Sequence, residues 1–243
     1  MRKWQLFFCH IPKTGGTSLR RSLESLIKPS ETVPDRDTLK RNGGKYPPLN
    51  DALAMVHERV DSIRFFRGHY HLSCRHFLPG GFKTVVLLRD PVERNISQFR
   101  HMIAHQGKSK DDLMERLYAG KPIGPDNTMT RFLGGSVMRD PKRSSSNVYS
   151  VRRPIDDPEL ELQQAITELA VCDFVGFTSD LPTLKDQLSE FAGTSLTIRV
   201  DNDSKGPAPV FTQQEIALFE RHNQLDRRLY EYAIQQKGLS LKS

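Results

Sequence analysis

The sequence predicts an α/β fold in which a mostly parallel central sheet is flanked by helices. Short apolar runs alternate with helical stripes along the chain. The runs over residues 4–9 and 83–88 are strongly apolar, which is typical of strands buried on both faces of a parallel sheet. A loop and then a helix follow each of them, and repeated strand–loop–helix units favour parallel pairing. We expect a single domain over residues 1–243.

The opening unit consists of a strand over residues 4–9, a loop over residues 10–16 and a helix that begins at Thr17. The helix is predicted to reach Ile27, because apolar residues recur three and four positions apart at Leu19, Leu23, Leu26 and Ile27. Residues 28–50 are rich in Pro, Gly, Asn and charged residues, so we expect little regular structure there. Residues 51–61 have a weak helical pattern.

The middle of the chain repeats the same unit. A strand is predicted over residues 63–67, and the strongest strand of the chain over residues 83–88. Residues 90–93 then supply an N-cap aspartate, a proline at the first helical position and a glutamate at the third, which together indicate the start of a helix. A short helix is expected over residues 111–119.

The C-terminal third is predicted to continue the alternation. Residues 136–156 are basic and rich in serine, and we expect them to form a flexible loop. Ser179 is predicted to cap a helix that reaches about Phe191. Thr212 and Glu215 form a capping box for one long final helix that ends near Gln236. The remaining elements are a helix over residues 158–171 and a strand over residues 173–177.

Composition limits the class of protein. The chain has 36 Lys and Arg against 29 Asp and Glu, and the resulting charge of +7 indicates an anionic partner. Its longest apolar run, residues 52–56, is far shorter than the roughly 20 residues of a membrane span. The three cysteines lie far apart, which disfavours a disulfide framework and suits a reducing compartment. The basic residues are scattered and only 8% of residues are aromatic, so we expect no nucleic-acid partner.

The loop after the first strand has the features of an anion site. Its two glycines allow backbone N–H groups to approach an anion, and the helix that follows adds a partial positive charge. The motif is not a Walker A loop, because its lysine precedes the glycines. The candidate ligands of a terminal phosphate or sulfate are Lys13, Thr14, Gly15, Gly16, Thr17 and Ser18.

A second candidate anion site follows the strand over residues 83–88. Arg89 stands at the end of the strand, and Ser97 lies two turns into the next helix. A guanidinium can bind two phosphate oxygens at once, and the hydroxyl adds another donor. Three basic residues of this helix, Arg94, Arg100 and His101, are expected on a solvated face.

The two motifs together resemble the sulfotransferases that use 3′-phosphoadenosine 5′-phosphosulfate (PAPS). The likeness is closest to the carbohydrate branch that includes the heparan sulfate 2-O- and 6-O-sulfotransferases and their bacterial relatives. Residues 10–19 look like the 5′-phosphosulfate loop of that family, and residues 88–97 look like its 3′-phosphate motif. Weaker similarities lie at residues 127–134, residues 174–177, Asn223, Leu225, Asp226, Leu229 and Tyr230.

The resemblance implies a nucleotide-kinase-like, P-loop-like fold and a role for each motif. Lys13 would contact the oxygen that bridges sulfur and the 5′-phosphate, where negative charge grows as the bond breaks. Residues 14–18 would hold the 5′-phosphate, and Arg89 and Ser97 the 3′-phosphate. PAPS would be the co-substrate and 3′-phosphoadenosine 5′-phosphate (PAP) the product. No metal is expected.

In the family that this chain resembles, a histidine that follows a glycine serves as the base. His69 matches that position, so we expect it to take the proton of the acceptor hydroxyl. His71 matches less clearly, although the two share a face if the strand continues. His10 precedes the phosphate loop and is expected to brace the loop rather than to react.

Two other functions stay open from the residues alone. In a nucleotide-dependent kinase, Asp90 would hold Mg²⁺. A non-catalytic protein would use the basic surface to bind anions or glycans. Under the sulfotransferase hypothesis the acceptor is a hydroxyl of a carbohydrate or glycolipid, and its identity is not encoded in any motif. The oligomeric state is not encoded either. The sequence contains no membrane-anchoring segment, so we expect a bacterial-type cytoplasmic enzyme, unless the chain is a trimmed form of an anchored enzyme.

Overall fold

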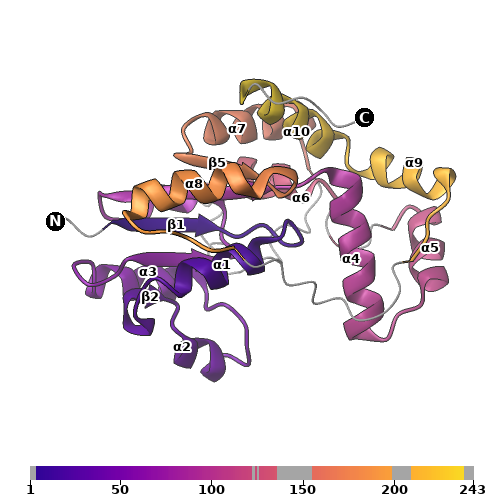
Figure 1. The fold of residues 1–243 in the computed structure, drawn as a ribbon. Helices are drawn as coiled ribbons and strands as arrows, with labels where there is room; N and C mark the ends of the chain where they lie inside the picture. The colour runs from indigo at the N-terminus through magenta and orange to yellow at the C-terminus, as the bar shows by residue number, and fades with distance from the viewer. Residues whose placement is uncertain (1–3, 122–123, 125, 136–154, 199–208, 238–243) are drawn as a thin grey trace.

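The computed structural model in Figure 1 describes residues 4–121, 124, 126–135, 155–198 and 209–237. Within these ranges, five strands form one sheet in the order β2-β3-β1-β4-β5, and all neighbouring strands are parallel. The predicted α/β class with a parallel sheet is therefore confirmed. The strands are β1 (Gln5–Cys9), β2 (Thr32–Val33), β3 (Phe65–Gly68), β4 (Phe82–Leu88) and β5 (Phe174–Phe177).

The sheet is covered by helices on both faces, which explains its uninterrupted apolar strands. Successive side chains of a strand point to opposite faces. On β1, Leu6 and Phe8 belong to one apolar cluster while Phe7 and Cys9 belong to the other, and all four are completely buried. The first cluster lies under α1 (Gly16–Glu24) and α8 (Leu181–Ala192). The second lies under α3 (Leu49–Glu58), α6 (Thr128–Gly134), α7 (Pro158–Ala170) and α10 (Gln224–Gln236).

A third apolar cluster lies away from the sheet, beyond the carboxyl ends of the strands (Figure 1). The cluster is built around Phe99, Leu113 and Phe219, each about 1% exposed. Its helices are α4 (Pro91–Gln106), α5 (Lys110–Tyr118) and α9 (Gln213–His222). The first half of α4 therefore lies at the end of the sheet, and its second half supports the added helices.

Residues 28–50 contain more regular structure than we predicted. They form η1 (Pro29–Glu31), the edge strand β2, α2 (Arg36–Arg41) and the start of α3. Strand β2 has two residues and is defined by its pairing with β3, a tertiary contact that no local pattern reveals. Helix α2 is also too short for a periodic signal. Another short helix, η2 (Leu72–Phe77), was likewise not predicted.

The prediction of one long final helix was wrong. Asn223 separates α9 from α10 with a non-helical backbone (φ −131°, ψ 36°). Its side chain donates to the Phe219 carbonyl at 2.8 Å and accepts from the Asn127 N–H at 3.1 Å. These hydrogen bonds compensate for the break in the helix.

Two helix ends also differ from the prediction. Helix α1 ends at Glu24, so Leu26 and Ile27 lie beyond it, although both still pack against the first cluster. Ser179 lies within η4 (Thr178–Asp180), and α8 begins after Asp180. The expected basic loop over residues 136–156 lies almost entirely outside the described residues. No described helix is long and apolar enough to cross a bilayer.

Candidate active site

The loop between β1 and α1 makes a tight turn around Thr14. Lys13 (φ 70°) and Gly15 (φ 82°) both have left-handed backbones. For a non-glycine residue such as Lys13 this conformation costs roughly 1–2 kcal/mol. The Thr14 hydroxyl donates to the Ile11 carbonyl at 2.9 Å, and Thr14 is completely buried. The loop is therefore held in a conformation that an isolated chain would avoid.

The turn leaves a row of backbone donors without protein acceptors. Among the described residues, the N–H groups of Thr14, Gly15, Gly16 and Thr17 have no hydrogen-bond acceptor, and Gly15 at the N-cap provides no side-chain cap. The Ser18 N–H donates to the Gly15 carbonyl at 3.2 Å. Consecutive unpaired donors at a helix N-terminus are suited to binding an anion. This part of the loop fits a phosphate or phosphosulfate group.

His10 packs directly against this loop. A Cβ atom at position 16 would overlap the His10 ring, so the glycine there allows the ring and the loop to touch. The ring also stacks on Phe8, with ring centroids 5.1 Å apart. Burial lowers the pKa of His10 well below its usual range, so the ring is neutral near pH 7. This position suits the bracing role that we expected for His10.

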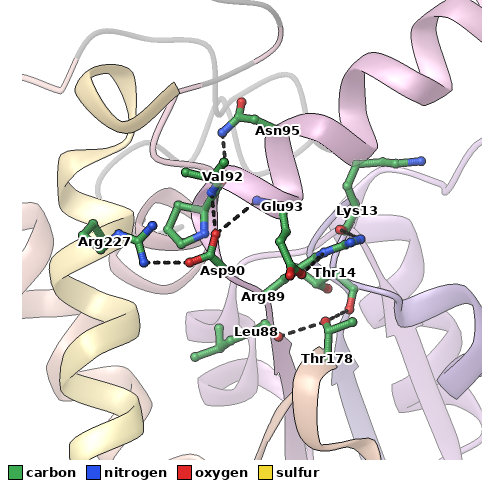
Figure 2. Close-up of polar contacts among 11 residues, drawn as sticks. Lys13, Thr14, Leu88, Arg89, Asp90, Val92, Glu93, Asn95, Thr178 and Arg227 are labelled. Carbon is green, nitrogen blue, oxygen red and sulfur yellow. Dashed lines mark hydrogen bonds and ion pairs between the residues drawn. The ribbon is translucent and has the colours of Figure 1, made fainter. Parts of the chain in front are cut away.

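Arg89 lies beside the same loop. Its Nη1 makes a long 3.5 Å contact with the Lys13 carbonyl, and its Nε donates to the Glu93 carboxylate at 3.3 Å (Figure 2). Ser97 lies one turn after Glu93 on the same side of α4, and its hydroxyl makes no hydrogen bond with a described residue. Arg89 and Ser97 thus lie along one side of the α4 N-terminus, with Arg89 next to the loop.

The carboxylate of Asp90 is fully engaged in holding helices together. One oxygen accepts from the N–H groups of Val92 and Glu93, at 2.9 and 3.1 Å. The other accepts from the Arg227 guanidinium on α10 at 2.7 Å (Figure 2). Asp90 therefore caps α4 and joins it to α10.

His69 follows the end of β3 and lies next to His10. Its Nδ1 is 2.6 Å from the His10 carbonyl, which can only accept a hydrogen bond. Nδ1 therefore carries the proton, and Nε2 has a free lone pair. No described residue forms a hydrogen bond with Nε2. The two imidazole centroids are 4.7 Å apart, and the Tyr46 ring meets His69 edge-on at 4.9 Å.

The surroundings of His69 keep its imidazole neutral. Burial lowers its pKa from 6.5 to about 4, and the positive charges of Arg20 and Arg67 act in the same direction. The hydrogen bond to His10 opposes this shift only in part. His69 is thus a neutral acceptor at pH 7, as a general base must be.

His71 has a different environment. Its Nδ1 lies 2.9 Å from the Arg131 carbonyl, its ring stacks on Phe132 with centroids 5.7 Å apart, and Gly135 packs against the ring. All three contacts belong to the end of α6. The arrangement indicates that His71 anchors α6 to the segment after β3.

Arg94 is buried, which corrects our expectation of a solvated face. It is 2% exposed, and no described residue accepts a hydrogen bond from its Nε. Burial lowers its pKa, and the negative charge of buried Asp226 acts against that shift. Arg100 and His101 are partly exposed. Burial lowers the pKa of His101, and the charges of Lys13 and His105 act in the same direction.

Two of the segments with weaker similarity to the family, residues 127–134 and residues 223–230, meet in the structure. Asp226 on α10 accepts from the Met129 N–H at 3.1 Å, the Thr130 N–H at 2.7 Å and the Thr130 hydroxyl at 2.8 Å. Asn127 accepts in turn from the Leu225 N–H at 2.9 Å. Residues about 100 positions apart thereby cap the α6 N-terminus, a contact that sequence patterns do not reveal.

A comparison with protein families shows the family of this chain. The model described as "Sulfotransferase family" matches residues 2–149, which include both anion motifs and His69. The chain belongs to the sulfotransferase family. The family's reaction is sulfuryl transfer, so the protein is a transferase that acts on an acceptor hydroxyl.

A solved structure shows the same fold over nearly the whole sulfotransferase. The crystal structure of a sulfotransferase from Alicyclobacillus acidocaldarius aligns with a TM-score of 0.53 and 14% sequence identity, covering 98% of this chain and 97% of that one. At this identity the likeness establishes the fold alone. The comparison with curated proteins finds no match.

Two further observations concern the candidate site. Within the described ranges, no three His, Cys, Asp or Glu side chains are grouped so that they could hold a metal ion. Thr178, which sequence reasoning missed, donates to the Thr14 and Leu88 carbonyls from the end of β5. A lone threonine after a strand has no pattern that would have marked it.

Proposed function

We propose that this sulfotransferase uses PAPS as the sulfuryl donor and a hydroxyl of a carbohydrate or glycolipid as the acceptor, with His69 as the base. PAPS supplies a sulfuryl group on a phosphate leaving group. The protein's own contributions are positioning and charge stabilisation, which are the main demands of an in-line transfer.

The loop after β1 holds the 5′ end of the nucleotide in this proposal. The unpaired N–H groups of residues 14–17 bind the 5′-phosphate, and the hydroxyls of Thr17 and Ser18 lie in the same turn. Lys13 adds a full positive charge at the point where the leaving group gains negative charge. Its ammonium extends away from the Arg89 and Thr178 contacts in Figure 2.

The start of α4 holds the 3′-phosphate. Arg89 offers the guanidinium and Ser97 the hydroxyl, and a phosphate would compete with Glu93 for Arg89. That exchange is favourable, because Glu93 is 60% exposed and its ion pair is correspondingly weak. A dianionic phosphate is a stronger partner for a guanidinium than one exposed carboxylate.

His69 takes the proton from the acceptor hydroxyl at Nε2. Its hydrogen bond to the His10 carbonyl holds the proton on Nδ1 and so presents the lone pair of Nε2. The low pKa keeps the ring ready to accept at neutral pH, although it also makes the ring a weaker base. Its proton affinity would rise as negative charge builds up next to it in the loaded site.

One observation carries the proposal. Two candidate anion-binding elements lie side by side at the ends of adjacent strands: Arg89 contacts the carbonyl of Lys13, the residue just before the free N–H row. A nucleotide with phosphates at both its 5′ and 3′ ends matches that pair. The kinase alternative loses support, because the Asp90 carboxylate already binds two N–H groups and Arg227.

The proposal is tested by transfer of labelled sulfate from PAPS to a panel of glycans and glycolipids. We expect Lys13→Ala and Arg89→Ala to abolish transfer, because each removes a full charge from one phosphate site. The matched controls Lys40→Ala and Arg228→Ala remove exposed charges on α2 and α10 and should leave activity unchanged. Full activity in either site variant would contradict the assignment.

A further inference from the structure

Thr178 joins the phosphate loop to the neighbouring strand. It is the first residue after β5, and its hydroxyl donates to the Thr14 carbonyl at 2.7 Å and to the Leu88 carbonyl at 3.1 Å. The single hydroxyl proton is therefore shared between the loop after β1 and the end of β4. Figure 2 shows Thr178 directly below the loop, next to Leu88.

This hydrogen bond fixes the direction of a peptide plane. In a trans peptide the C=O and N–H groups point in opposite directions. Because the Thr14 carbonyl points to Thr178, the Gly15 N–H must point away from β5. The Lys13 carbonyl likewise points to Arg89, so the Thr14 N–H points away from Arg89. Thr178 thus orients one of the four donors of the row, the Gly15 N–H, from behind the loop.

The methyl group of Thr178 also supports the loop. A Cβ built on Gly15 would lie 3.5 Å from Cγ2 of Thr178 and 3.7 Å from the Leu87 side chain. The threonine therefore packs behind the glycine whose N–H it orients. A β-branched side chain has few χ1 states, so the methyl and hydroxyl positions are fixed together.

We propose that Thr178 is a positioning residue for the anion-binding loop: its hydroxyl presets the direction of the Gly15 N–H toward the 5′-phosphate. The inference rests on the proposed function, in which that loop binds PAPS. It extends the site to β5, beyond the residues 2–149 that match the family.

The test compares two variants that separate the hydroxyl from the methyl. Thr178→Val keeps the shape and removes the donor, whereas Thr178→Ser keeps the donor. We expect Thr178→Val to weaken PAP binding about tenfold in calorimetry and to raise KM for PAPS with little change in kcat, since a lost hydrogen bond has that size. Thr178→Ser should bind like the wild type.

The matched control is Thr167→Val, which removes a side-chain hydrogen bond to a carbonyl on the exposed face of α7. It should leave PAP binding unchanged. Equal PAP affinity in Thr178→Val and the wild type would overturn the positioning role and leave the proposed function intact.

A second readout does not depend on PAPS. The order parameters of the Gly15 and Gly16 amides, measured by ¹⁵N relaxation without nucleotide, should fall in Thr178→Val and not in Thr178→Ser. If the wild type fails to bind PAP, the proposed function fails, and these amides alone decide the role of Thr178. Unchanged order parameters in Thr178→Val would then overturn it.

Discussion

At the scale of single residues, the state of His69 is determined by its neighbours. The His10 carbonyl selects the tautomer, and burial next to Arg20 and Arg67 disfavours the charged form. A histidine in solution would be partly protonated at pH 6.5. Here the same side chain stays neutral to well below that pH.

The first prediction concerns His69→Gln. The glutamine amide can still donate to the His10 carbonyl but cannot accept a proton, so we expect kcat to fall about 100-fold or more while PAP affinity is kept. Sulfate transfer and calorimetry on the same preparation measure both. His76→Gln, at a half-exposed ring on η2, is the control. Normal turnover in His69→Gln would show that the base lies elsewhere.

Predictability at this scale depended on whether a residue belongs to a local pattern. Lys13 and Arg89 could be singled out because each stands between a strand and a helix. Arg94 could not be recognised as buried, because a charged residue on an amphipathic helix usually faces solvent. Its burial depends on Asp226, 132 positions later, which supplies the compensating charge.

At the scale of elements, the connection between α6 and α10 keeps the second half of the chain in place. Asp226 is completely buried and accepts three hydrogen bonds from the first turn of α6. Burial raises the pKa of its carboxyl, while Arg94 and these donors act against that shift. The Asp226 side chain accepts hydrogen bonds from the free N–H groups at the start of α6, a role that normally belongs to the N-cap residue next to the helix.

The second prediction is that Asp226→Asn is destabilising. An amide has one accepting oxygen, so its NH₂ group would face a backbone N–H of α6 and leave that donor unpaired. We expect a loss of about 2–3 kcal/mol in the free energy of unfolding, measured with urea. Asp186→Asn, at an exposed position of α8, should change it by less than about 0.5 kcal/mol. Equal stability of Asp226→Asn and the wild type would contradict this account of the connection.

Elements with long local patterns were predictable, and elements made by tertiary contacts were not. The runs in β1 and β4 and the caps of α4 and α9 are visible in the sequence. Strand β2 exists because it pairs with β3. The break at Asn223 exists because Asn127 and Phe219 bind its side chain.

At the scale of the whole molecule, the site lies where parallel sheets usually place ligands. Strands β1, β3, β4 and β5 all end at the same edge, and Lys13, His69, Arg89 and Thr178 follow these four strands. This is the general position of ligands in open α/β folds. No such rule predicts where an acceptor binds, because loops usually form such pockets. The single domain over residues 1–243 stays a prediction.

The third prediction concerns the dependence of stability on pH. The folded-state pKa values of His69 and His10 lie below that of an unfolded histidine, near 6.5. Between about pH 6.5 and pH 4 the unfolded state therefore binds more protons, and the stability that these rings contribute is lost as the pH falls through this window. Each ring contributes a slope of at most about 1.4 kcal/mol per pH unit. Asp226, with its raised pKa, acts in the opposite direction.

Comparing His69→Gln with the wild type isolates the contribution of one ring. Urea unfolding at pH 7, 6, 5 and 4.5 should show the wild type losing stability faster than the variant as the pH falls. Parallel curves for the two proteins would contradict the low pKa of His69.

The central claim is that the two anion sites together bind a nucleotide phosphorylated at both the 5′ and 3′ ends. Calorimetry of the wild type with PAP and with ATP tests it most directly. ATP lacks the 3′-phosphate that Arg89 and Ser97 would hold, so we expect PAP to bind about tenfold or more tightly. No detectable PAP binding, or equal affinity for the two nucleotides, would contradict the claim.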